Sequence, residues 1–125
     1  MTTHRQGKPA TFESPSADPR IRCAFEDDGE TGYLYALDYS DGGAQPIKDA
    51  VSLYNVQSAN DLEIAVEFKW SEDGRKCGLL LNGVLEAFAD FDRQLLSAKS
   101  NFPAISIWTR QSRPTWDDKF ADQLH

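Results

Sequence analysis

Residues 62–85 read LEIAVEFKWSEDGRKCGLLLNGVL, and this stretch decides the fold. In its first part, apolar side chains alternate with polar ones, a period of two that is typical of a strand with one wet face. Two dipeptides preferred in tight hairpin turns follow, Asp73-Gly74 and Asn82-Gly83. The stretch therefore predicts two consecutive β-hairpins.

The turn chemistry also predicts the register of both hairpins. With the first dipeptide as a two-residue turn, Phe68 faces Leu79, and apolar residues meet apolar residues along the ladder. With the second dipeptide as a turn, Leu80 faces Leu85. That second register also places Glu86 opposite Leu79 on the apolar face, a conflict that a bulge or an end-of-sheet position would remove.

From Ile21 onward, the chain alternates apolar stretches with glycine-containing turns, which favours β-structure throughout. The loop Asp27–Thr31 separates two such stretches as a hairpin loop would. The further strands that we expect are Ile21–Glu26, Gly32–Tyr39, Asp49–Val56 and Ala104–Trp108.

The C-terminal segment has the signals of a helix start. Thr115 is a good N-cap, acidic residues follow it, and Trp116, Phe120 and Leu124 are spaced four apart. The expected fold class is therefore mainly β (α+β). We predict a curved antiparallel sheet of about six or seven short strands with a C-terminal helix, about residues 115–124, packed on one face.

Residues 1–20 are expected to form a proline-containing tail. They hold three of the six prolines, and Phe12 is their only large apolar side chain, so they offer little surface to offset the entropy of ordering. Residues 21–125 are then a single β-rich domain. Its predicted core contains Phe25, Tyr35, Leu37, Leu53, Ile64, Val66, Phe68, Trp70, Leu79, Leu81 and Phe88.

The charge balance limits the classes of partner that we expect for this chain. Asp and Glu number 20 against 13 Lys and Arg, a net charge of −7. Such a chain lacks the basic surface that releases counterions from a phosphate backbone, so we expect neither nucleic acid nor an anionic membrane as partner. The sequence contains neither an apolar run of membrane-spanning length nor a signal-peptide pattern, which leads us to expect a cytoplasmic location.

The positions of the cysteines and histidines in the sequence argue against several kinds of catalytic and metal site. Cys23 and Cys77 both lie in apolar stretches and are expected as buried free thiols, although neighbouring strands would also permit a disulfide between them. His4 lies in the expected tail and His125 ends the sequence, so neither offers the rigid imidazole that a catalytic triad or a zinc site requires. We therefore predict no catalytic, metal-binding or cofactor-binding residue.

Acidic residues form the candidate interaction surface. Their spacing lacks the alternating oxygens of a calcium loop. The surface comprises Glu26, Asp27, Asp28, Glu30, Glu72 and Asp73.

Three functions remain open. The first is a non-enzymatic module that engages a basic protein, as immunity or inhibitor proteins do. The second is a β-domain with an apolar cavity for a small ligand. The third is a hydrolase that uses carboxylates such as Glu67, Glu72 or Asp73. A homodimer through an exposed sheet edge, Ile21–Glu26 or Ala104–Trp108, is a further expectation.

Three segments, Phe25–Asp38, Ile47–Val56 and Phe68–Arg75, resemble a small bacterial family that is widespread in proteobacteria and known only as a domain of unknown function. The resemblance covers roughly residues 24–103 and includes Asn101-Phe102-Pro103. It implies a stand-alone cytoplasmic β-domain and brings no catalytic residues and no ligand.

Overall fold

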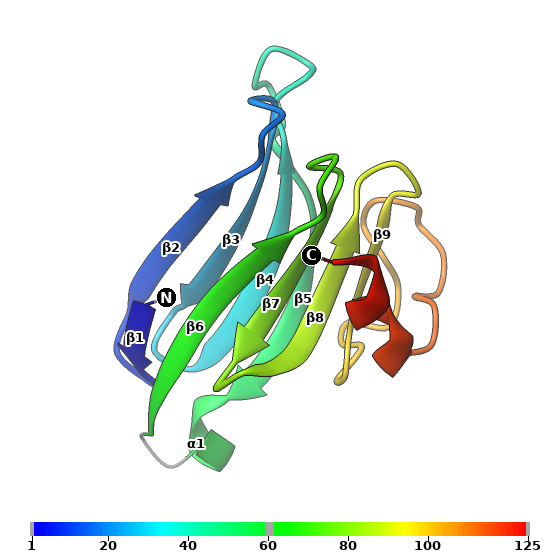
Figure 1. The fold of residues 1–125 in the computed structure, drawn as a ribbon. Helices are drawn as coiled ribbons and strands as arrows, with labels where there is room; N and C mark the ends of the chain where they lie inside the picture. The colour runs from blue at the N-terminus through cyan, green and yellow to red at the C-terminus, as the bar shows by residue number, and fades with distance from the viewer. Residues whose placement is uncertain (1, 60–61, 125) are drawn as a thin grey trace.

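The computed structural model describes residues 2–59 and 62–124. In these residues the chain is mainly β, and two antiparallel sheets pack against each other (Figure 1). The five-stranded sheet has the order β1-β6-β7-β8-β9 and the four-stranded sheet the order β2-β3-β4-β5. The expected single curved sheet of six or seven strands is thus corrected to two sheets, and the N-terminal residues add one strand to each of them.

The elements have the following bounds. The five-stranded sheet contains β1 (Thr2–Arg5), β6 (Glu63–Trp70), β7 (Lys76–Leu81), β8 (Val84–Asp90) and β9 (Leu95–Ala98). The four-stranded sheet contains β2 (Ala10–Pro15), β3 (Ile21–Asp27), β4 (Thr31–Asp38) and β5 (Ile47–Asn55). The described residues also form two short helices, α1 (Val56–Ala59) and a 3-10 helix (Asp118–Gln123).

The prediction that residues 1–20 form a tail is wrong. β1 pairs with β6, and β2 pairs with β3 along its whole length. Phe12 stacks on Phe25 with ring centroids 5.9 Å apart, and His4 is buried. Edge strands gain much of their order from backbone hydrogen bonds to a neighbouring strand. The small number of apolar side chains in residues 1–20 was therefore a poor guide to whether this segment is ordered.

The core lies between the sheets and confirms most of the prediction. Phe25, Ile64, Val66 and Leu79 are buried there, and Leu53, Phe68, Trp70 and Leu81 are partly buried against them. Phe88 and Leu37 are buried elsewhere: Phe88 packs in a second cluster with Phe120, and Leu37 lines a hollow on the outer face of the four-stranded sheet. The prediction that Tyr35 is a core residue is wrong. Leu34 and Ala36 take the inward positions of β4, so Tyr35 points to the outer face.

The two cysteines face each other across the core. Cys23 on β3 and Cys77 on β7 are both free thiols with no exposed surface. Burial and the hydrogen bond with the Cys23 thiol raise the pKa of Cys77 well above its usual value. The expectation of buried free thiols is confirmed.

The predicted hairpin registers are confirmed. Phe68 pairs with Leu79, and Leu80 pairs with Leu85. A register shift between Leu79 and Leu80 then brings Ala87 opposite Leu79, so the expected conflict with Glu86 is removed by a bulge.

The first turn differs in type from the prediction. Gly74 has a positive φ of 72°, but Asp73 does not. Ser71 donates its backbone N–H to the Lys76 carbonyl, and the Asp73 carboxylate accepts hydrogen bonds from the Ser71 hydroxyl and the Arg75 amide. The result is a four-residue loop with the same centre as a two-residue turn, and for that reason the register stays the same.

The second turn is the expected primed turn, with φ of 52° at Asn82 and 79° at Gly83. Gly83→Val is expected to lower the free energy of unfolding by about 1–3 kcal/mol, because a β-branched residue is strained at this φ. Nothing lies within 4 Å of an added Cβ, so the cost comes from the backbone alone. Thermal melts that give Gly83→Val and the double variant Glu72→Gln/Asp73→Asn equal melting temperatures would refute this placement.

Two further expectations are corrected. Ala104–Trp108 forms no strand; only Ile105 makes an isolated bridge, with Ser112, and the last strand is Leu95–Ala98 instead. Ile21–Glu26 is an internal part of the four-stranded sheet, flanked by β2 and β4. Neither segment is therefore a free sheet edge for a homodimer.

The C-terminal helix is shorter than predicted. It is a six-residue 3-10 helix that begins at Asp118, and Asp117 rather than Thr115 caps it by accepting a hydrogen bond from the Lys119 amide. Phe120 stacks on Phe88 with centroids 4.6 Å apart. Within the described part of the chain, no helix has the length and apolar character needed to span a bilayer.

Candidate functional site

The predicted acidic residues do not gather into one surface. Asp28 and Glu30 are exposed in the loop between β3 and β4, whereas Glu72 and Asp73 are exposed in the loop between β6 and β7. Figure 1 places these two loops at opposite ends of the strands. Asp27 is buried, with 1% of its surface exposed.

Glu26 belongs to a different feature, the outer face of the four-stranded sheet. A hollow of about 310 Å³ lies there, and both Glu13 and Glu26 line it. Three tyrosines share this side of the sheet. We call the surface the tyrosine face, and it comprises Glu13, Arg22, Glu26, Tyr33, Tyr35, Leu37, Tyr39 and Ile47.

Alternation along the strands explains the composition of the tyrosine face. In β4, Leu34 and Ala36 point into the core, so Tyr33 and Tyr35 point outward. Their ring centroids are 6.0 Å apart. The Tyr35 hydroxyl donates a 2.7 Å hydrogen bond to Glu26, and burial together with this carboxylate raises the pKa of Tyr35 above its ordinary value.

One cation already rests on this face. The guanidinium of Arg22 lies over the Tyr39 ring, 5.7 Å from its centroid. An oxygen of Glu13 is 3.9 Å from the same guanidinium. Among the described residues, nothing accepts a hydrogen bond from the buried Nε of Arg22. The arrangement suits guanidinium groups, which stack on aromatic rings and pair with carboxylates.

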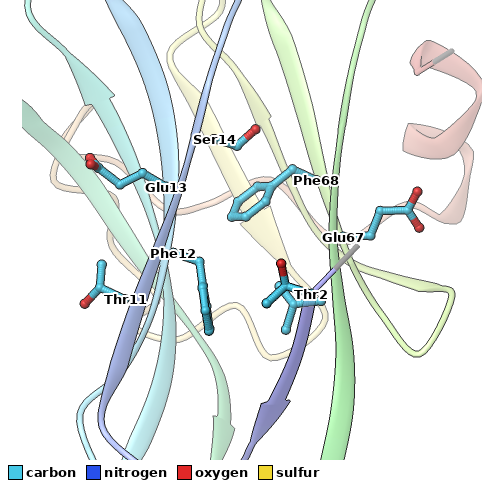
Figure 2. A pocket seen from close by; sticks show the side chains of 8 residues that line it. Thr2, Thr11, Phe12, Glu13, Ser14, Glu67 and Phe68 are labelled. Carbon is cyan, nitrogen blue, oxygen red and sulfur yellow. The ribbon is translucent and has the colours of Figure 1, made fainter.

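A second hollow, of about 540 Å³, opens between β2 and β6. In Figure 2, Phe12 and Phe68 point toward each other across it, while Glu13 and Glu67 point away. At one side, the Trp70 indole donates a 2.9 Å hydrogen bond to the Ser14 hydroxyl and links the two sheets. This hollow is the place where an apolar group would fit between the sheets.

Asp27 is the centre of a buried polar cluster that the sequence did not reveal. His4 contacts one of its oxygens at 2.9 Å, and Tyr54 donates to the same oxygen at 2.7 Å. The backbone amides of Gly7 and Gly29 complete the set, each at 2.8 Å. Burial raises the pKa of Asp27, but these hydrogen bonds outweigh burial and leave the pKa below its ordinary value.

A second buried cluster joins Asp49 on β5 to Arg113 in the C-terminal segment. The guanidinium pairs with both carboxylate oxygens, at 2.7 and 3.0 Å, and neither side chain exposes more than 1% of its surface. Arg113 also donates to three backbone carbonyls. Because every group is paired, the cluster fixes structure and leaves no free group for chemistry.

The carboxylates considered for hydrolysis are not arranged for it. Glu67 is exposed within β6, whereas Glu72 and Asp73 lie in the loop that follows this strand. Hydrogen bonds from the Ser71 hydroxyl and the Arg75 amide lower the pKa of Asp73, whereas a general acid requires a raised one. Across residues 2–59 and 62–124, no three His, Cys, Asp or Glu side chains form a group that could hold a metal ion.

Comparison with known proteins gives the family but no activity. Residues 4–125 match the family described as an uncharacterized protein conserved in bacteria (DUF2251). The chain belongs to this family. An uncharacterized protein of Haemophilus influenzae is 44% identical over 92 residues, which cover 70% of this chain and 56% of that protein. No solved structure matches.

The family match corrects the extent of the expected resemblance. It begins at His4 and ends at the last residue, so the proline-containing segment and the residues after Trp108 belong to the shared family unit. Both regions contribute to the buried clusters, through His4 and Arg113 respectively. The H. influenzae protein is longer than this chain, which spans 56% of its length.

Proposed function

We propose that this protein is a non-enzymatic interaction module that binds a basic protein segment on the tyrosine face, as an immunity or inhibitor protein engages its target. The observation that carries the proposal is the stacking of Arg22 on Tyr39 beside Glu13. The face already holds one guanidinium, and Glu26 supplies a further carboxylate at the same hollow.

Charge supports the same partner class. A net charge of −7 would steer a basic protein toward this chain and would repel nucleic acid and anionic lipid. Arginine should be preferred over lysine, since a planar guanidinium stacks on tyrosine and pairs with a carboxylate at the same time. We place the interaction on the tyrosine face rather than on the acidic loops, because those loops lie at opposite ends of the fold.

A second candidate function is binding of a small apolar ligand between β2 and β6. The hollow of about 540 Å³ has a volume typical of ligand sites, and Phe12 and Phe68 line it. Its other lining side chains are mainly threonine, serine and glutamate. The tyrosine face remains our leading site because it combines rings with carboxylates.

The proposal is tested by titrating the ¹⁵N-labelled protein with octa-arginine and, separately, with octa-lysine. We expect shifts concentrated at Tyr33, Tyr35 and Tyr39, with octa-arginine binding several-fold more tightly and both affinities falling as salt is added. Shifts confined to the loops that carry Asp28 and Glu72, or equal affinities for the two peptides, would contradict the proposal.

A further inference from the structure

An apolar surface without acidic residues lies in the C-terminal segment, in contrast to the acidic tyrosine face. Three large apolar side chains are exposed there, Phe102 at 66%, Ile105 at 54% and Ile107 at 60%. We call residues 99–112 the apolar loop (orange in Figure 1). Exposed apolar groups gathered on one short segment of a small protein mark an interaction site more often than chance.

The apolar loop is held in place rather than left loose. The Ser106 hydroxyl and the Ile107 amide donate to the buried Asp49 carboxylate at 2.7 and 3.1 Å. Arg113 donates to the Pro103 carbonyl at 2.6 Å. A loop that is ordered before binding loses less entropy when it docks.

The charge around the apolar loop identifies the kind of partner. Residues 93–116 contain four basic residues, Arg93, Lys99, Arg110 and Arg113, and no acidic residue, although the chain carries 20 acids in all. Arg113 is buried against Asp49, and Lys99 lies 3.5 Å from a Glu86 oxygen, so the exposed Arg110 is the cation that this loop offers to a partner. The surface therefore fits a partner that offers an apolar hollow flanked by carboxylates.

The tyrosine face has that chemistry. Its hollow is lined by Leu37, Ile47 and tyrosine rings, with Glu13 and Glu26 beside them. We infer that the apolar loop of one copy docks on the tyrosine face of a second copy, so that this loop, with Arg110, supplies the basic segment proposed above. This inference rests on the proposed function of the tyrosine face.

The position of the loop favours a closed dimer. Ser52 on β5 donates its backbone N–H to the Phe102 carbonyl, which fixes the apolar loop at the β5 edge of the four-stranded sheet. The tyrosine face is the outer face of that same sheet. A two-fold axis would let each copy place its loop on the other copy's face, an arrangement that closes after two copies.

Sedimentation velocity on the full chain, from micromolar to millimolar concentration, tests the inference. We expect a dimer that weakens about tenfold or more in Phe102→Ser/Ile107→Ser and in Arg110→Glu. Val84→Ser removes a similarly exposed side chain, 49% exposed at the β7–β8 turn, and should leave the dimer unchanged. Mixing Arg110→Glu with Glu26→Lys should restore association that neither variant shows alone.

A chain that stays monomeric throughout this range would overturn the inference, and so would a dimer that survives both loop variants. The experiments distinguish failure of the dimer inference from failure of the proposed function of the tyrosine face. Phe102→Ser/Ile107→Ser keeps that face, so its titration with octa-arginine reports on the proposed function alone.

Discussion

Arg113→Met is expected to lower the free energy of unfolding by about 3–5 kcal/mol, the largest effect of any single change considered for this protein. The substitution leaves the Asp49 carboxylate buried without its cation, and it removes the donors to the Pro103, Leu96 and Ala50 carbonyls. An unpaired buried charge is far more costly than the loss of an exposed ion pair. Urea denaturation at neutral pH measures the difference.

Arg20→Met is the matched control, because the Arg20 side chain is 62% exposed and its partner Asp18 keeps a second ion pair with Arg75. Its effect should stay below about 1 kcal/mol. Hydrogen exchange adds a local readout, since the Ile107 amide should lose protection in Arg113→Met. A loss of stability no larger than that of the control would show that the cluster does not hold the C-terminal segment.

Asp27→Asn is expected to cost about 3 kcal/mol, because hydrogen bonds to a charged acceptor are among the stronger ones and an asparagine cannot accept from all four donors. The donors left without a full partner are His4, Tyr54 and the amides of Gly7 and Gly29. Asp28→Asn changes the neighbouring exposed carboxylate and should have little effect.

The cost of Asp27→Asn should depend on pH. The folded pKa of Asp27 is depressed, so its contribution is complete above the unfolded value of about 4 and is lost as the pH falls through the folded value. Unfolding curves of the wild type and Asp27→Asn should therefore converge in acid. A stability gap that stays constant from pH 7 down to pH 2 would rule out the charged carboxylate as its cause.

Local signals in the sequence were sufficient for the central hairpins. Alternation in β6 and the Asn82-Gly83 turn act over a few residues, so the register of Phe68 against Leu79 could be predicted without any tertiary information. The conflict at Glu86, where an acidic residue falls on the apolar face, followed from the same reasoning, which left a bulge and an end-of-sheet position as alternatives; the structure has the bulge.

The sequence could not reveal contacts that exist only once the sheets stack. His4 meets Asp27 across 23 positions, and Arg113 meets Asp49 across 64, with no spacing that links them. β1 and β2 carry little apolar periodicity because edge strands depend on a neighbour's backbone. For the same reason, the acidic residues looked like one surface in the sequence but are divided between a buried cluster, two loops and the tyrosine face.

The most direct test of the proposed binding surface compares two double variants with equal changes in charge. Glu13→Gln/Glu26→Gln alters the tyrosine face, and Glu72→Gln/Asp73→Asn alters the β6–β7 loop. Calorimetric titration with octa-arginine should show affinity about tenfold weaker for the first variant and less than about twofold weaker for the second. Equal losses in both variants would show that net charge alone attracts the peptide and would contradict a specific site on the tyrosine face.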